Sequence, residues 1–320
     1  MSQAAPSRLT APGGDGVAIV TRTKNRPLLL RRAIESVLGQ SHPNWVQVIV
    51  NDGGEPAAVE ALVAEYLPRY GERLLVIHNG ASVGMEAASN IGLRATDSRF
   101  CVIHDDDDAW HPEFLARTVA ALMAPTSPTY RGVIAWSEMV REAIEGTTVT
   151  EVERSSFNSW ARDVSFWRML HLNSFPPISF LYERSALEEI GYYNEAMPVL
   201  GDWEFNLRFL ERYDIAVVPE HLAHYHIRTE GAPREFGNSI TAGFDRHMTQ
   251  HTLLVNALLR DDLEKGTVGL GVLANLARDL QIMKDQTAEV GQRMDKAAAD
   301  AAARRRRRLS NRIRRFFGMR

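Results

Sequence analysis

Four consecutive aspartates, Asp105, Asp106, Asp107 and Asp108, follow an apolar segment at 100–104. Like charges at this spacing repel one another unless a cation or hydrogen bonds compensate them. Carboxylate oxygens suit Mg²⁺ or Mn²⁺, which bind one or two protein carboxylates together with substrate phosphates. A solvated acidic turn in front of a helix, opened by His111 or Pro112, is the alternative. The neighbouring Trp110 favours a metal site, because a solvated turn does not require a large aromatic residue beside it.

A second acidic turn, Asn51-Asp52-Gly53-Gly54, follows the apolar segment 45–50. Asp-Gly is a typical hairpin dipeptide. However, residues 57–66 have a helical hydrophobic period, so a strand, a tight turn and a helix are predicted here instead. Asp52 is then a candidate for holding a ribose or a base edge.

Asp202 stands at the start of a predicted helix at 203–213. An aspartate in this place caps free backbone N–H groups, and it can also act as a general base. The two roles do not exclude each other, since capping and the helix dipole favour the ionised carboxylate. Residues 173–177 (NSFPP) predict a rigid turn that is a candidate for acceptor contacts.

Two histidines, His224 and His226, follow a predicted strand at 215–219. Alternate residues of an extended segment face the same way, so either histidine is a candidate metal or phosphate ligand. A structural role is the more common one for a histidine.

The elements that position these residues indicate an α/β fold, a mostly parallel sheet flanked by helices. Polar clusters follow the first, second and fourth predicted strands, and the first cluster is Arg22-Thr23-Lys24-Asn25. Because ligands bind beyond the carboxyl ends of such strands, a single crevice is expected. The first four strands are predicted at 17–21, 45–50, 74–78 and 100–104, with helices from near Pro27, Pro56 and Gly84. Further strands are predicted at 132–139 and 178–182, and 150–175 is expected to form loops and short helices over the crevice.

Composition excludes several classes of protein. Of 320 residues, 45% are hydrophobic and 24% are charged, which is typical of a globular chain. The single cysteine, Cys101, excludes an intramolecular disulfide and a Cys-rich zinc site. No signal peptide and no run of eighteen apolar residues is found, so a cytoplasmic protein is expected.

The C-terminal part is predicted to be helical. Apolar residues from Leu273 to Ala301 recur at heptad spacing, which is compatible with a coiled coil and a homo-oligomer, or with a single long helix. Residues 304–320 contain nine arginines and no acid, so residues 1–303 carry 28 basic against 40 acidic residues and the net charge of −3 conceals a basic tail. Leu309, Ile313, Phe316 and Phe317 form one apolar stripe, which predicts a basic amphipathic helix on an anionic membrane surface. A disordered tail is the main alternative, and nucleic acid is not expected as a partner.

From Val17 to about His226 the chain resembles the family 2 glycosyltransferases, inverting enzymes of the GT-A fold. The resemblance rests on the order and spacing of several segments: VAIVTRTKNRPLLLRRAIESVLGQS, NDGG, NGASVGMEAASNIGL, DDDDAWHPEFL, IGYYNE and GDWEFNLRFL. It implies metal-dependent transfer of a sugar from a nucleoside-diphosphate sugar to a hydroxyl of a glycan or lipid-linked acceptor. With the basic tail, it implies an enzyme of bacterial surface polysaccharide assembly, peripheral on the inner face of the cell membrane.

The resemblance also implies roles for individual residues. Asp52 would bind the nucleotide base, with Arg22 and Thr23 beside it. Asp107 would bind Mn²⁺ or Mg²⁺, with Asp105 and Asp106 contacting the ribose or water of the metal. Asp202 would be the catalytic base, and His226 would approach the diphosphate or the metal. The expected domains are a disordered 1–16, a GT-A domain at 17–240, a helical extension at 241–303 and a membrane-binding tail at 304–320.

The sequence departs from the family pattern at two places, and two other functions are compatible with it. Lys24 stands where many members carry an aromatic residue, and Ala88-Ser89-Asn90 stands where many have Ala-Arg-Asn. A catalytically silent, membrane-tethered scaffold that binds nucleotide or glycan is one alternative function. A nucleotidyltransferase is the other, but residues 21–27 contain no glycine, unlike the usual glycine-rich loop of that class.

Overall fold

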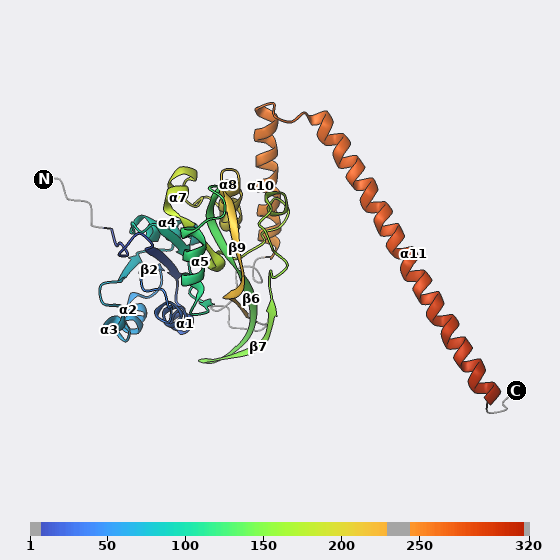
Figure 1. Ribbon diagram of the computed structural model, residues 1–320, viewed down its shortest axis with the longest axis horizontal. Coiled ribbons are helices and arrows are strands. Elements are labelled where there is room, and N and C mark those ends of the chain that lie inside the picture. The colour runs from blue at the N-terminus through green and yellow to red at the C-terminus, as the bar shows by residue number, and fades with distance from the viewer. Residues whose placement is uncertain (1–7, 229–243, 317–320) are drawn as a thin grey trace. The chain divides into compact units, whose positions relative to one another are not determined.

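Apolar, β-branched runs build the first half of a mixed sheet in the computed structural model (Figure 1). The structure describes residues 8–228 and 244–316, and the side chains of 8–228 and 245–296. The first four strands are β1 (Val17–Thr23), β2 (Trp45–Asp52), β3 (Leu74–Asn79) and β4 (Phe100–Ile103). They are parallel and lie in the order β3-β2-β1-β4. The predicted α/β class and these four strands are confirmed, because both faces of such strands are buried and their apolar runs are easily recognised.

Helices between these strands begin where the sequence predicts. The helices are α1 (Pro27–Leu38), α2 (Pro56–Ala64), the short α3 (Leu67–Tyr70), α4 (Met85–Arg94) and α5 (Phe114–Met123). Pro27 occupies the first turn of α1, where its missing N–H costs nothing. Figure 1 shows α1 to α3 on one side of the strands and α4 on the other. These strands therefore lie between two layers of helices.

The second half of the sheet mixes strand directions. It consists of β5 (Ala109–Trp110), β6 (Tyr130–Glu145), β7 (Thr148–Ser156), β8 (Phe180–Glu183) and β9 (Asp214–Arg228). The whole sheet has the order β3-β2-β1-β4-β8-β6-β9-β5, and β7 pairs with β6 outside this path. Strand β8 runs antiparallel to β4, while β6 and β9 are parallel to each other.

Several predictions for this half were wrong. The segment 150–175 was expected to lack strands, but β7 covers its first residues and pairs antiparallel with β6 across a two-residue turn at Gly146, whose φ is +61°. The charged side chains of Glu151, Glu153 and Arg154 are exposed along β7, so β7 has no apolar run to recognise. Strand β8 begins at Phe180 because a 3₁₀ turn, Pro177–Ser179, occupies the start of the predicted strand. Strands β6 and β9 extend well beyond their predicted limits.

Short helices and an aromatic core support the second half. The helices are α6 (Phe166–Met169), α7 (Arg184–Ile190) and α8 (Gly201–Leu210). Phe205 and Phe209 on α8 pack against Tyr182 of β8 at ring-centroid distances of 5.3 and 6.3 Å. This packing fixes α8 against the sheet, and with it the residues at the start of α8.

Residues 9–11 are held against the body of the protein. Leu9 and Ala95 share a backbone hydrogen bond of 2.9 Å, and the N–H of Ala11 donates to Ser98 Oγ at 2.9 Å. This part of the chain differs from the expected disordered segment 1–16, and residues 1–7 lie outside the described residues.

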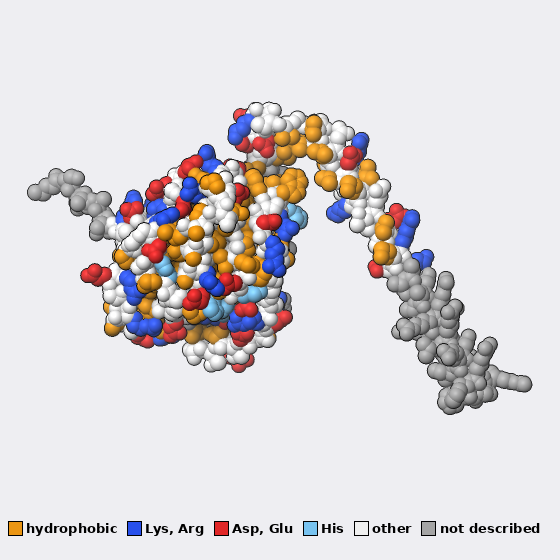
Figure 2. Space-filling model, viewed as in Figure 1, with side chains coloured by type: hydrophobic (Ala, Val, Ile, Leu, Met, Phe, Trp, Pro, Cys, Tyr) orange, Lys and Arg blue, Asp and Glu red, His pale blue; other side chains and the backbone are white. Residues whose placement is uncertain are grey.

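The C-terminal part is helical, as predicted. It contains α10 (Phe244–Glu264) and α11 (Leu270–Phe316). The chain divides into two compact units, residues 1–252 and 253–320. Along α11, Figure 2 shows hydrophobic side chains on the surface among charged ones; Leu280 is 63% exposed and Met294 is 68% exposed. No helix among the described residues is long and apolar enough to cross a membrane.

Candidate functional site

The ends of β1 and β4 bring together four residues that the sequence singled out. Arg22 Nε donates to Asp105 Oδ1 at 3.0 Å, and Thr23 Oγ1 donates to Asp106 Oδ2 at 2.7 Å. The contacts form because β1 and β4 are neighbouring parallel strands whose carboxyl ends coincide. Of these four residues, Arg22 and Asp105 line a cavity, whereas Thr23 and Asp106 are buried beneath them.

Arginines compensate the charge of the aspartate run. Arg26 Nε donates to Asp106 Oδ2 at 3.1 Å and Arg26 Nη1 reaches Asp107 Oδ2 at 3.4 Å. Arg228, which is buried on β9, also pairs with Asp107. Asp108 accepts the backbone N–H of His226 at 2.7 Å. Burial alone would raise the pKa of Asp107, but Arg26 and Arg228 hold it below the ordinary value of 3.8.

Sequence reasoning missed both arginines. Arg26 directly precedes the helix-opening Pro27, and Arg228 stands two residues beyond His226 in an extended segment. Side chains alternate along a strand, so Arg228 lies on the same face as His226. This spacing of two residues was the sequence signal that could have identified Arg228.

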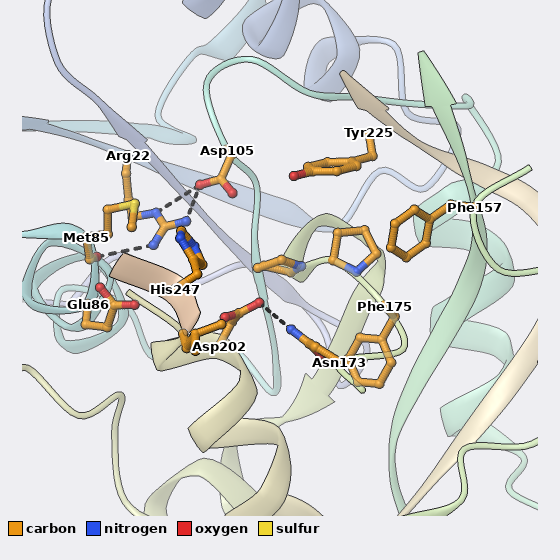
Figure 3. Close-up of a pocket in the computed structure, with 13 residues that line it drawn as sticks. Arg22, Met85, Glu86, Asp105, Phe157, Asn173, Phe175, Asp202, Tyr225 and His247 are labelled. Carbon is orange, nitrogen blue, oxygen red and sulfur yellow. Dashed lines mark hydrogen bonds and ion pairs between the residues drawn. The ribbon is translucent and has the colours of Figure 1, made fainter. Parts of the chain in front are cut away.

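A cavity of about 220 Å³ opens beside the Arg22–Asp105 pair (Figure 3). Figure 3 shows Arg22, Glu86 and Asp202 on one side and the aromatic rings of Tyr225, Phe157 and Phe175 on the other. The lining thus combines charged groups that can hold polar or ionised parts of a ligand with apolar rings that exclude water.

Asp202 lies in this cavity, in the first turn of α8. It accepts a hydrogen bond from Asn173 Nδ2 at 2.8 Å. The predicted capping role is wrong in its detail, because α8 begins at Gly201 and Leu200, with φ of +64°, is the N-cap residue. Burial raises the pKa of Asp202, against the opposing effects of the Trp203 N–H and of Asn173. A carboxylate with a raised pKa is a better proton acceptor than an exposed aspartate.

Glu86, at the start of α4, is a further buried acid of the cavity and was not singled out in the sequence. Burial raises its pKa to about 7; Arg22 opposes the shift, and Asp202 adds to it. Glu86 packs against Gly201, where an added Cβ would lie 2.2 Å from Glu86 Oε1. Glycine at position 201 therefore allows the acids of α4 and α8 to approach each other.

Asp52 lies apart from this cavity and organises a loop. Its Oδ1 accepts from Asn79 Nδ2 at 2.8 Å and from the Val83 N–H at 2.9 Å; its Oδ2 accepts from Ser82 Oγ at 2.6 Å and from the Gly84 N–H at 3.1 Å. Each oxygen thus already has two donors. The expected contact of Asp52 with a nucleotide base stays a prediction. It requires that one of these hydrogen bonds to Asp52 breaks when the nucleotide binds.

His226 belongs to a buried cluster on the other side of the aspartate run. Its Nδ1 lies 2.7 Å from Glu142 Oε1 and 2.9 Å from Arg32 Nη1, and Arg32 pairs with the same glutamate. His224, also on β9, has its Nε2 3.6 Å from Glu138 Oε2 of the neighbouring strand β6, and burial lowers the pKa of His224 to about 4. Of the two histidines, His226 is the one that the structure places next to the aspartates.

The donor chemistry of the aspartate run fits a divalent cation that draws most of its ligands from elsewhere. Among the described residues, no three His, Cys, Asp or Glu side chains form a group that could hold a metal ion. Both arginine contacts of Asp107 go to Oδ2, and the carboxylate of Asp105 lines the cavity. One or two such carboxylates suffice for Mg²⁺ or Mn²⁺ when phosphate oxygens and water supply the other ligands.

Curated relatives are glycosyltransferases. The chain is 29% identical over 204 residues to an uncharacterized glycosyltransferase of Bacillus subtilis, YwdF, which covers 63% of this chain and 71% of that protein. It is 27% identical over 192 residues to a PGL/p-HBAD biosynthesis glycosyltransferase of Mycobacterium bovis, covering 60% of this chain and 68% of that protein.

Solved structures share the fold. The crystal structure of TarS residues 1–349 from S. aureus matches with a TM-score of 0.53 at 18% identity, over 66% of this chain and 60% of that one. The mannosyltransferase PcManGT from Pyrobaculum calidifontis, solved with GDP-Man and Mn²⁺, matches with a TM-score of 0.51 at 18% identity, over 83% and 79% of the two chains. These matches confirm the predicted GT-A type of fold.

The sequence profile of one protein family, glycosyl transferase family 2, matches residues 18–191. This range contains β1 to β4 and the aspartate run, in which the resemblance first appeared. The chain therefore belongs to the family 2 glycosyltransferases.

Proposed function

We propose that this protein is an inverting, metal-dependent hexosyltransferase that moves a sugar from a nucleoside-diphosphate sugar to a hydroxyl of a glycan or lipid-linked acceptor. The observation that carries the proposal is the half-buried Asp202, which shares one cavity with the Arg22–Asp105 pair. In this arrangement a proton acceptor would lie on one side of the reacting sugar and a polar region that binds the donor on the other. The name of the mycobacterial relative supports a biosynthetic role, and bacterial surface polysaccharide assembly is proposed here.

Asp202 would take the proton of the acceptor hydroxyl as its oxygen attacks the anomeric carbon. The bond between that carbon and the diphosphate oxygen breaks on the opposite face, and its electron pair leaves with the nucleoside diphosphate. A single displacement of this kind inverts the anomeric centre. Asn173 holds the Asp202 carboxylate through the bond of 2.8 Å, so the accepting oxygen is oriented before the acceptor arrives.

Donor binding is assigned to the ends of β1 and β4, where Arg22, Thr23, Asp105 and Asp106 meet. Asp107 would hold Mn²⁺ or Mg²⁺, with His226 near the diphosphate, and the ion when bound would neutralise charge on the leaving group. The complex of PcManGT with GDP-Man and Mn²⁺ supports this assignment by analogy of fold.

Two proposals concern the rest of the chain. The basic tail at 304–320 would hold the enzyme on the cytoplasmic face of the membrane, and the exposed apolar residues of α11 within 273–301 would form a homo-oligomeric contact. The exposure of Leu280 and Met294 on α11 supports the second proposal.

The substitution Asp202→Asn tests the catalytic assignment. Asparagine has nearly the same shape but cannot accept the proton, so we expect transfer to fall by at least about 10²-fold while nucleoside diphosphate still stabilises the protein against heat. Asp97→Asn, at an exposed site away from the cavity, is the matched control. Turnover near that of the unmodified protein, measured with a panel of sugar nucleotides and Mn²⁺, would remove Asp202 from the proposed role.

A further inference from the structure

An exposed group of large apolar side chains lies between residues 160 and 172, around the short helix α6. We call this group the aromatic patch; it consists of Trp160, Phe166, Trp167, Leu170 and Leu172, which are 45%, 37%, 84%, 41% and 52% exposed. Soluble proteins rarely expose several large apolar side chains in one place unless the surface binds something. Trp167 is the clearest case, because most of its indole contacts solvent.

The exposed side chains of the patch are not needed to hold α6 in place. Met169, on the same helix, is fully buried, and the N–H of Arg168 donates to Ser165 Oγ at the helix start. Trp203 Nε1 also donates to the carbonyl of Met169 at 2.6 Å. These inward contacts anchor the helix, so its outward-facing Phe166 and Trp167 are not what holds it in place.

Basic groups border the aromatic patch. The guanidinium of Arg168 lies 4.6 Å from the ring of Trp160, and that of Arg162 lies 4.7 Å from the ring of Trp136. Asp163 is the acid of this stretch. Indole rings beside arginine are the side chains that proteins place at the boundary between lipid headgroups and acyl chains, where the ring is partly buried and the cation meets lipid phosphate.

The aromatic patch is continuous with the proposed acceptor side of the active site. Leu172 lines a second cavity of about 370 Å³, together with Leu200, Trp203 and Met248. This cavity shares Asn173 and Leu200 with the cavity that contains Asp202. An apolar surface therefore leads from the patch to the residue that binds Asp202.

We infer that the aromatic patch docks the catalytic unit onto an anionic lipid bilayer, independently of the C-terminal tail. Trp160, Phe166 and Trp167 enter the interface while Arg162 and Arg168 contact lipid phosphates. The second cavity then faces the bilayer and admits the apolar end of a lipid-linked acceptor. This last step rests on the proposed transferase function, whereas the docking itself does not.

A single-cysteine label tests the docking in the full chain. Cys101 is fully buried, so the variant Trp167→Cys presents one reactive thiol for an environment-sensitive fluorophore. Phosphatidylcholine vesicles with about 30% phosphatidylglycerol supply the anionic surface. We expect a blue shift and strong quenching by a lipid-borne quencher. The matched control is Leu67→Cys on α3, an apolar position that is 49% exposed near the far edge of the sheet, and its label should change little.

Three outcomes would overturn the inference. In the first, the label at 167 remains unchanged while flotation shows the chain bound to the vesicles. In the second, the labels at 167 and 67 respond equally. In the third, the shift at 167 appears at high protein concentration without vesicles, which would assign the patch to a second copy of the chain. Adding Asp202→Asn separates the two proposals, since it should abolish transfer and leave the response at 167 unchanged.

Discussion

At the scale of single residues, Asp107 carries the most specific expectation about the metal. Its ion pairs with Arg26 and Arg228 give this carboxylate a structural role in addition to the proposed one. We predict that Asp107→Asn removes the increase in nucleoside-diphosphate affinity that Mn²⁺ produces, because an amide is a poor ligand for a hard cation. Calorimetric titration with and without Mn²⁺ measures this increase. An unchanged increase would assign the metal to other groups, and Asp97→Asn, at an exposed site, serves as the control.

Glu86 makes the stability of the fold depend on pH. Its pKa of about 7 in the folded protein lies above the ordinary value of 4.5, so the folded protein retains a proton that the unfolded chain releases. The contribution of Glu86 to stability is therefore complete below pH 4.5 and declines as the pH rises to 7. The shift corresponds to a change on the order of 3 kcal/mol in the free energy of unfolding.

We predict that Glu86→Gln removes this decline, since glutamine does not ionise. Urea unfolding should show the variant more stable than the unmodified protein at pH 8 and similar to it at pH 5. The exposed Glu72→Gln is the control and should follow the unmodified protein at both values. Parallel pH profiles for the Glu86 variant and the unmodified protein would contradict the prediction.

The sequence predicted the acids of the site better than their partners. Asp105, Asp106 and Asp202 stand at strand or helix ends, where a short segment of sequence already indicates their position. The partners of these acids come from distant segments, such as Asn173 for Asp202, and 121 residues separate Arg228 from Asp107 in the same aspartate run. Only the pairing of β6 with β9 and of β9 with β5 brings that segment to the aspartates, and no local pattern records this pairing.

At the scale of elements, burial on both faces decided which strands could be predicted. The buried strands β1, β2 and β4 contain continuous apolar runs, and their limits were predicted to within two residues. Strand β7 exposes most of its residues, and β6 and β9 continue past their apolar parts into polar residues that pair with each other. The polar part of β9 carries His226 and Arg228. Hydrophobic patterning could therefore not predict the end of β9 that contains these candidate site residues.

The packing of α4 on β1 depends on Gly92. A Cβ at this position would lie 2.4 Å from Val20 Cγ1, although alanine is the better helix former by about 1 kcal/mol. We predict that Gly92→Ala nevertheless lowers the free energy of unfolding by about 1–2 kcal/mol, because overpacking of a core costs more than the helix gains. Adding Val20→Ala should restore part of the loss in urea unfolding. A Gly92→Ala variant as stable as the unmodified protein would mean that β1 and α4 separate easily.

At the scale of the whole molecule, the distribution of charge matters more than its sum. Residues 1–303 carry 28 basic against 40 acidic residues, whereas 304–320 carry nine arginines and no acid. At long range an acidic body is repelled by anionic lipid, so the tail would supply the attraction that first brings the enzyme to a membrane, and the aromatic patch would add its own short-range contacts there. The backbone of 304–316 is helical as part of α11, while the side chains of this segment and Phe317 lie outside what the structure describes; the amphipathic membrane-binding helix there stays a prediction.

We predict that removing residues 304–320 lowers binding of the chain to anionic vesicles by more than about tenfold, since each arginine near such a surface contributes about 1 kcal/mol. Flotation with vesicles of phosphatidylcholine and phosphatidylglycerol measures the bound fraction. High salt should weaken binding of the full chain toward that of the shortened one, because it screens the arginines and leaves apolar contacts intact. Vesicles of phosphatidylcholine alone are the control, on which both chains should bind weakly. If the two chains float equally on anionic vesicles, the tail is not the membrane anchor, and attachment would have to come from the catalytic unit.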